Sequence, residues 1–125
     1  MSEREARILL VEDDLTLRET LAEVLVDEGH EVRAAAHGDE ALDHLDGWEP
    51  DLILLDVMMP TMDAYEFRLR QRQLGIAPGA QTLVISATRD IEAAATRLEA
   101  NAWIAKPFLL DEVVDTVDRL LGMTA

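Results

Sequence analysis

Polar residues that could do chemistry follow the short apolar runs of this chain, in the positions where a parallel sheet places its functional groups. They are Glu12 and Asp13 after residues 8–11, Asp56 after residues 52–55, Ser86 after residues 83–85, and Lys106. Short apolar runs are typical of buried strands, and parallel strands carry their chemistry at their carboxyl ends. Three carboxylates gathered there would repel one another unless a cation lay among them. The pattern therefore predicts a site that binds a divalent metal ion.

Five apolar strands alternate with amphipathic stretches, which is the pattern of a doubly wound α/β domain. We expect these strands at residues 8–11, 31–35, 51–56, 83–85 and 102–105. The stretch at residues 63–74 is ambiguous, because Tyr65, Phe67 and Leu69 alternate with polar residues as in a strand. Two adjacent parallel strands need a crossover connection, so we expect a helix there.

The helices are predicted from caps and apolar stripes. Thr16 and Glu19 have the spacing of a capping box, and the apolar stripe that follows them stops at Gly29. Further helices are expected at residues 41–48, 91–98 and 110–121. An acid after a strand is often a helix N-cap, and we expect such a minor role for Asp14. With Thr16 as the better cap, Glu12 and Asp13 have no structural task, which favours a functional one.

Composition narrows the class of protein. The 125 residues are 49% hydrophobic, which is enough for the core of one domain. A net charge of -15 argues against direct binding to nucleic acid or anionic lipid. No apolar run approaches the roughly 20 residues of a membrane helix, and residues 1–5 lack the features of a signal peptide, so we expect a cytoplasmic protein. There is no cysteine for thiol chemistry, and Lys106 is the only lysine.

Three motifs carry a resemblance to a known family. Residues 8–14 read Ile-Leu-Leu-Val-Glu-Asp-Asp, residues 51–60 read Asp-Leu-Ile-Leu-Leu-Asp-Val-Met-Met-Pro, and residues 106–108 read Lys-Pro-Phe. In this order the chain resembles the receiver domain of bacterial two-component response regulators. The resemblance implies a single receiver domain over residues 1–125. It also implies a flavodoxin-like fold, with a five-stranded parallel sheet in the order 2-1-3-4-5 and helices on both faces.

The resemblance implies a role for each acidic residue. Asp56 would be the nucleophile that accepts a phosphoryl group from the phosphohistidine of a sensor histidine kinase or phosphotransfer protein. Asp13 and Asp56 would bind Mg²⁺ directly, together with the carbonyl of Met58, and Glu12 would act from further out through water. The metal would offset the charge of the carboxylates and of the incoming phosphoryl group. The domain would catalyse only its own phosphorylation and dephosphorylation, and we do not expect another enzyme activity.

The resemblance also implies a switch. The peptide between Lys106 and Pro107 would be cis, which would direct Lys106 into the site. Lys106 would contact the phosphoryl oxygens, and the Ser86 hydroxyl would donate a hydrogen bond to another of them. Trp103 stands where the family has a switch aromatic, although a plain core or surface aromatic is an equal alternative. Phosphorylation would then change self-association or binding to a downstream effector through the face made by the fourth helix, last strand and last helix.

Alternatives from other classes remain open at this point. A pseudo-receiver, which acts as an interaction module without phosphorylation, should have lost at least one site residue, and none is lost. A phosphotransferase of the haloacid-dehalogenase type also uses an aspartate after a strand, but it needs a second acid two residues later, where Met58 stands. Asp56 and Lys106 could also form a purely structural ion pair, and Ser86 could be an ordinary strand-end hydroxyl.

Several residues depart from the family pattern or have no predicted role. Ala64 and Glu99 stand where glycine is usual, and the step from Ser86 to Lys106 is two residues shorter than usual, which indicates a trimmed fourth helix. The apolar residues 108–110 either form an exposed patch or pack inward. The three histidines have no metal-binding spacing and are predicted to lie on the surface. They are His30, His37 and His44.

Overall fold

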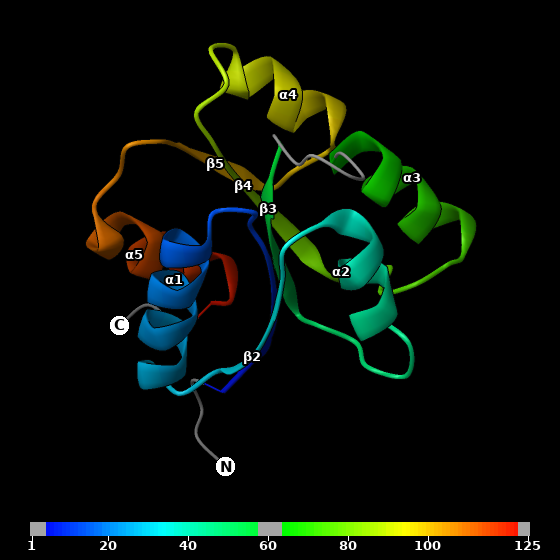
Figure 1. Ribbon diagram of the computed structural model, residues 1–125, viewed down its shortest axis with the longest axis horizontal. Coiled ribbons are helices and arrows are strands. Elements are labelled where there is room, and N and C mark those ends of the chain that lie inside the picture. The colour runs from blue at the N-terminus through cyan, green and yellow to red at the C-terminus, as the bar shows by residue number, and fades with distance from the viewer. Residues whose placement is uncertain (1–4, 58–63, 123–125) are drawn as a thin grey trace.

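A computed structural model describes residues 5–57 and 64–122, and within these residues five parallel strands form one sheet in the order β2-β1-β3-β4-β5 (Figure 1). The strands are β1 (Arg7–Val11), β2 (Glu31–Ala35), β3 (Leu52–Asp56), β4 (Gln81–Ser86) and β5 (Ala102–Ala105). The helices are α1 (Leu15–Asp27), α2 (Gly38–His44), α3 (Ala64–Gln73), α4 (Ile91–Arg97) and α5 (Leu110–Leu120). The predicted doubly wound fold and strand order are confirmed.

Helices cover both faces of the sheet, with α1 and α5 on one side and α2, α3 and α4 on the other (Figure 1). Successive strand residues point to opposite faces, so each central strand supplies both cores. The core beneath α2, α3 and α4 includes Leu9, Val11, Ile53, Leu55 and Val84. The core beneath α1 and α5 includes Ile8, Leu10, Leu52, Leu54 and Ile85. Burial on both faces explains why these strands are continuous apolar runs rather than alternating ones.

The ambiguous stretch before the fourth strand is a helix, as the crossover argument predicts. In α3, Phe67 is fully buried and Tyr65 is half-buried. Leu69 remains 55% exposed, so the apparent strand alternation includes one residue that the core does not use. Topology therefore outweighed the local pattern in this segment.

The preference for Thr16 as the cap of the first helix is wrong, and Asp14, for which we expected only a minor capping role, is the cap. α1 begins at Leu15, and its N-cap is Asp14, whose Oδ1 accepts a hydrogen bond from the backbone N–H of Leu17 at 2.8 Å. Thr16 lies inside the first turn and is exposed. The helix starts sooner because Asp is at least as good an N-cap residue as Thr, and the Asp14 carboxylate already satisfies a free N–H of the first turn.

The expectations for Trp48 and His30 also need correction. α2 ends at His44, so Trp48 lies beyond the helix, where it is buried and its indole N–H donates to Glu31 Oε2 at 3.1 Å. His30 is not a surface residue, because it is only 5% exposed and its Nδ1 accepts from the backbone N–H of Ala6 at 3.1 Å. His37 and His44 are half-buried.

The turn after the short helix α4 has an unusual backbone. Glu99 adopts a left-handed conformation with φ of 57°, which a residue other than glycine rarely takes. Arg72 of α3 forms an ion pair with its carboxylate at 2.6 Å. Arg68, also on α3, donates from Nε to the carbonyl of Leu98 at 3.1 Å. Two arginines of α3 therefore hold the turn in which the expected glycine is missing.

Candidate functional site

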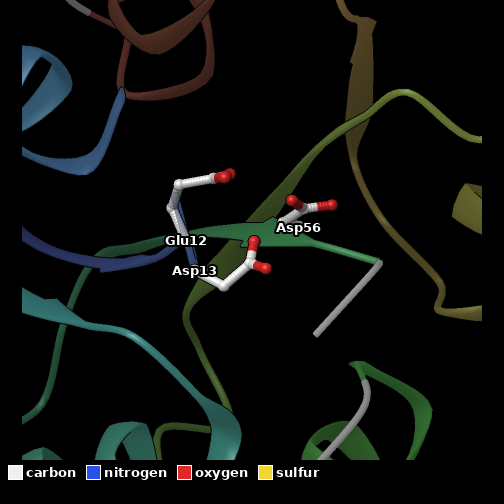
Figure 2. Close-up of side chains that lie close together, drawn as sticks. All are labelled: Glu12, Asp13 and Asp56. Carbon is white, nitrogen blue, oxygen red and sulfur yellow. The ribbon is translucent and has the colours of Figure 1, made fainter. Parts of the chain in front are cut away.

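The acidic residues singled out in the sequence meet at the carboxyl ends of β1 and β3. These strands are neighbours and parallel, and Val11 pairs with Leu55 in their register. Glu12 and Asp56 are the next residues of the two strands, so they reach the same level of the sheet edge. Figure 2 shows the side chains of Glu12, Asp13 and Asp56 gathered at this edge.

The three carboxylates are close enough to share one cation. Each offers an oxygen, and these oxygens all lie within 4.8 Å of one another. Glu12 is completely buried and Asp56 is 2% exposed, whereas Asp13 is exposed to solvent. Hard oxygen donors with one side open to water are the environment that Mg²⁺ prefers, since it retains several waters when protein-bound. The donor set therefore fits a magnesium ion.

Lys106 provides the positive charge of the site. Its Nζ lies 3.0 Å from both carboxylate oxygens of Glu12 and 3.0 Å from Asp56 Oδ2. The lysine follows β5 and is held there by its backbone N–H, which donates to the carbonyl of Ser86 at 2.9 Å. The peptide between Lys106 and Pro107 is cis, as the resemblance implies. One ammonium group thus bridges two buried carboxylates that come from different strands.

Burial controls the protonation of this cluster. It raises the pKa of Glu12 from 4.5 to about 7, and the hydrogen bond from Lys106 opposes that rise without cancelling it. Burial alone would lower the pKa of Lys106, but hydrogen bonds to Glu12 and Asp56 outweigh it, and the pKa is raised. Lys106 is therefore charged at neutral pH, while Glu12 exchanges a proton near neutrality.

Ser86 stands at the end of β4, beside the acidic cluster. Asp56 pairs with Ile85 in the register of β3 and β4, so Ser86 is one residue further along the same edge. The serine is fully buried, and its Oγ accepts from the backbone N–H of Thr88 at 3.2 Å. The ends of β1 and β3 thus provide the carboxylates, the end of β4 provides a hydroxyl, and the end of β5 provides a lysine.

Trp103 lies on β5 but apart from the acidic cluster. It pairs with Val84 in the register of β4 and β5, two residues before the pair of Ser86 and Ala105. Its side chain is 43% exposed, so the indole is at the surface. The predicted metal ligand Met58 lies outside the described residues.

Contacts in the β1–α1 loop were missed at the level of sequence. Arg18 Nη1 donates to the carbonyl of Glu12 at 2.9 Å and to that of Asp13 at 3.4 Å. Glu12 Oε1 also accepts from the backbone N–H of Asp14 at 3.2 Å. The interpretation that Glu12 lacks a structural task is therefore wrong. An arginine in the first turn of a helix after paired acids is the signal that could have pointed to Arg18.

An apolar surface borders the site, and the two alternatives for residues 108–110 each hold for part of this segment. Leu109 is 71% exposed and Leu110 is 38% exposed, so these two side chains do not pack inward. Phe108 is half-buried and packs against the core beneath α1 and α5. A shallow cavity next to them is lined by Leu17, Ala87, Lys106, Pro107 and Phe108.

Comparison with known proteins identifies the family. The model of the response regulator receiver domain matches residues 8–118. The chain belongs to the response regulator receiver family. It is 36% identical over 121 residues to the response regulator MprA of Mycobacterium sp. (strain KMS), and this match covers 95% of the chain and 52% of the relative. The chain spans about half the length of the curated relatives it matches.

Solved structures of receivers have the same fold. The chemotaxis protein CheY4 of Vibrio cholerae has a TM-score of 0.83 and 29% identity, with 93% of this chain and 98% of that chain covered. TrrA of Thermotoga maritima, solved in complex with Mg²⁺ and BeF, has a TM-score of 0.78 and 31% identity, with coverage of 91% of this chain and 97% of that chain.

Response regulators interact with histidine kinases and effector domains, and receiver domains generally bind Mg²⁺ through acidic residues. Among residues 5–57 and 64–122, no helix has the length and apolar character to cross a membrane.

Proposed function

We propose that this receiver accepts a phosphoryl group on Asp56 from the phosphohistidine of a sensor histidine kinase or phosphotransfer protein. One observation carries the proposal: the buried carboxylate of Asp56 combines a lysine at 3.0 Å with two acidic neighbours whose oxygens lie within 4.8 Å. A structural ion pair would need only the lysine. The additional carboxylates favour a site built to hold a cation next to a nucleophile.

The chemistry is a transfer between two nucleophiles. A carboxylate oxygen of Asp56 attacks phosphorus, a P–O bond forms, and the P–N bond to the donor imidazole breaks with its electron pair going to nitrogen. Lys106 moves its ammonium from the carboxylates toward the phosphoryl oxygens, where it neutralises developing charge. The hydroxyl of Ser86 turns to donate a hydrogen bond to another phosphoryl oxygen.

The acidic cluster holds Mg²⁺ in this proposal. Asp13 and Asp56 bind it directly and Glu12 acts from further out, with the carbonyl of Met58 as a further ligand expected from the family pattern. When bound, the ion supplies the positive charge that lets an anionic carboxylate approach an anionic phosphoryl group. Exposure of Asp13 leaves a path from solvent for the ion, while burial of Glu12 and Asp56 keeps their charges in a medium where the ion is strongly attracted.

The output surface of the proposal is the face formed by α4, β5 and α5. Ser86 and Thr88 lead from the site into α4, and the exposed Trp103 lies on β5 in this face. A shift of the Ser86 hydroxyl changes this face and thereby the affinity for a downstream effector or a second copy of the chain. Gel filtration with and without beryllofluoride separates the two outcomes, since only self-association enlarges the protein alone. A cytoplasmic location is part of the same proposal.

The decisive experiment is labelling with phosphoramidate in the presence of Mg²⁺, followed by mass spectrometry of the intact protein. The unmodified protein should gain one phosphoryl group, and Asp56→Asn should gain none. Asp51→Asn is a matched control, because Asp51 is exposed, immediately precedes β3, and lies at the opposite end of that strand from Asp56. Labelling of Asp56→Asn to the level of the control would overturn the assignment.

The same experiment addresses the other function classes. A pseudo-receiver would show no label in the unmodified protein at any Mg²⁺ concentration. A haloacid-dehalogenase-type enzyme would turn over the phosphoramidate many times, whereas a receiver would retain one phosphoryl group on Asp56. The family match favours the receiver over this enzyme class.

A further inference from the structure

The loop that carries Glu12 and Asp13 is tied to helix α1 by three kinds of contact. Asp14 caps the helix by accepting from the N–H of Leu17 at 2.8 Å. Glu12 Oε1 accepts from the N–H of Asp14 at 3.2 Å. Arg18, one turn into α1, reaches back to the carbonyls of Glu12 and Asp13 at 2.9 and 3.4 Å.

Within residues 5–57 and 64–122, the hydrogen bonds of Arg18 go to the backbone carbonyls of the acidic residues and not to their carboxylates. Both contacts are made by Nη1, whose two N–H donors can serve two successive carbonyls. The two carbonyls belong to the two residues whose side chains enter the acidic cluster. Fixing these peptide groups fixes the direction in which both side chains leave the chain.

Asp13 depends most on this restraint. Glu12 is completely buried and is held by Lys106 at 3.0 Å, so packing and an ion pair define its position. Asp13 is exposed, so packing does not hold its carboxylate in place. The direction of this side chain therefore depends on the conformation of the Asp13 backbone. A mobile ligand lowers the affinity of a site for its metal ion, because ordering the ligand when the ion binds costs conformational entropy.

We propose that Arg18 is a positioning residue that sets the Mg²⁺ affinity of the acidic cluster by clamping the Glu12 and Asp13 carbonyls. This inference rests on the proposed function, because it assumes that the cluster binds Mg²⁺. Groups that orient metal ligands from behind typically change metal affinity by about 10- to 100-fold when they are removed.

The sign of the effect separates positioning from simple charge. Arg18 is a cation near a cation site, so its charge alone opposes Mg²⁺ binding, and removing it would tighten binding. The positioning role predicts the opposite. Arg18→Ala should weaken Mg²⁺ binding by about tenfold. Arg18→Lys keeps the charge, but its ammonium nitrogen stands one bond nearer the backbone than Nη1 and reaches the two carbonyls less well, so this variant should also bind Mg²⁺ more weakly than the unmodified protein.

The test is isothermal titration calorimetry of the purified chain with MgCl₂, with denaturant unfolding measured on the same samples. Arg33→Ala is the matched control, because Arg33 Nη1 also donates to a backbone carbonyl, that of His44 at 3.2 Å, away from the acidic cluster. It should lower the stability without changing the Mg²⁺ affinity. Both Arg18 variants are compared at temperatures where unfolding curves show them fully folded.

Each result has one meaning. Weaker Mg²⁺ binding by both Arg18 variants, with unchanged binding by Arg33→Ala, supports the proposal. Unchanged or tighter binding by Arg18→Ala overturns it, and so does an Arg18→Lys protein that binds like the unmodified one. If the unmodified protein itself fails to bind Mg²⁺, the proposed function fails instead, so the two failures are distinct.

Discussion

The ammonium of Lys106 lies 3.0 Å from Asp56 Oδ2, in direct contact with the carboxylate that we propose as nucleophile. The same ammonium contacts Glu12 at 3.0 Å. In this arrangement the lysine takes the position of counter-ion that a metal ion would otherwise hold alone. Under the proposed function, Lys106 and Mg²⁺ would compete in part for the same negative charge, and the lysine would become available to a phosphoryl group as the ion binds.

Replacing Lys106 with methionine should change stability and metal affinity in opposite directions. Without Mg²⁺, the variant leaves two buried carboxylates without their cation, and we expect the free energy of unfolding to fall by up to about 3 kcal/mol. Its Mg²⁺ affinity should increase several-fold, since the ion no longer competes with the ammonium. Denaturant unfolding in EDTA and calorimetric titration with MgCl₂ measure the two effects.

Arg119→Met is the control for that experiment. Arg119 lies in the last turn of α5 and is exposed, so its replacement makes the same change in net charge away from the site. Its stability and Mg²⁺ affinity should stay close to those of the unmodified protein. A Lys106→Met protein that binds Mg²⁺ more weakly than the control would show that the lysine helps to hold the ion and does not compete with it.

Glu12 should make the metal-free protein less stable as the pH rises. Its pKa is about 7 in the folded protein and 4.5 ordinarily, so between these values the folded state binds more protons than the unfolded state. The stabilising contribution is complete below about pH 4.5 and is lost as the pH passes through about 7. Glu12→Gln carries no titrating proton, so its stability relative to the unmodified protein should rise by on the order of 2 kcal/mol between pH 5 and pH 8.

Unfolding in denaturant with EDTA, at both pH values, measures this difference. Glu23→Gln, at an exposed position of α1, removes the same charge from the surface and controls for net charge. If Glu12→Gln and Glu23→Gln shift equally with pH, the buried carboxylate is not the source of the dependence.

The meeting of the candidate site residues at one edge of the sheet could be predicted from the sequence, because each of these residues directly follows an apolar run. Glu12, Asp13, Asp56 and Ser86 follow apolar runs, and parallel pairing places all such positions at one edge. Lys106 was singled out by the order of the three motifs. Its contact with Glu12 joins residues 94 positions apart, so residue spacing could not predict it. Contacts of that range depend on the assembled sheet.

Other features were missed for identifiable physical reasons. Thr16 and Glu19 matched a capping box, yet Asp14 is the cap, because its carboxylate accepts from the N–H of Leu17 and starts the helix two residues earlier. His30 is buried because its Nδ1 pairs with the N–H of Ala6, a partner that only the sheet brings near. A polar residue looks like a surface residue until its hydrogen-bond partner is known.

Arg68 should be important for stability, although it is remote from the acidic cluster. It donates to the carbonyl of Leu98 at 3.1 Å and to Gln71 Oε1 at 3.1 Å, so it supports the turn in which Glu99 adopts a left-handed backbone. We expect Arg68→Ala to lower the free energy of unfolding by about 2 kcal/mol, because the charged donor to two buried residues, Leu98 and Gln71, is lost.

Arg70→Ala provides the comparison on the same helix. Arg70 pairs with Glu66 at 3.4 Å, and both side chains are about half exposed, so its loss should lower the free energy of unfolding by about 0.5 kcal/mol or less. Denaturant unfolding of both variants gives the two values. Equal losses would mean that the turn after α4 does not depend on its contact with α3.

Trp103 should report the change that phosphorylation makes in the output face. Its indole is 43% exposed, so a rearrangement of β5 and α4 can bury it further, which would move its fluorescence emission to shorter wavelength. Trp48→Phe removes the second fluorophore. In that background, beryllofluoride added after Mg²⁺ should shift the emission. Ser86→Ala should keep the response to Mg²⁺ and lose the response to beryllofluoride, because the hydroxyl that accepts from Thr88 at 3.2 Å is gone.

The two additions separate metal binding from switching. Mg²⁺ alone reports on the acidic cluster, which Ser86→Ala leaves intact, whereas beryllofluoride stands in for the phosphoryl group that the Ser86 hydroxyl would contact. A double variant with Asp56→Asn should lose the beryllofluoride step as well, since the acceptor carboxylate is absent. If Ser86→Ala responds to beryllofluoride as fully as the Trp48→Phe background, Ser86 does not control Trp103. The short α4, only seven residues long, would then transmit the change by another route, such as the contact of Arg97 with the Tyr65 ring at 4.3 Å.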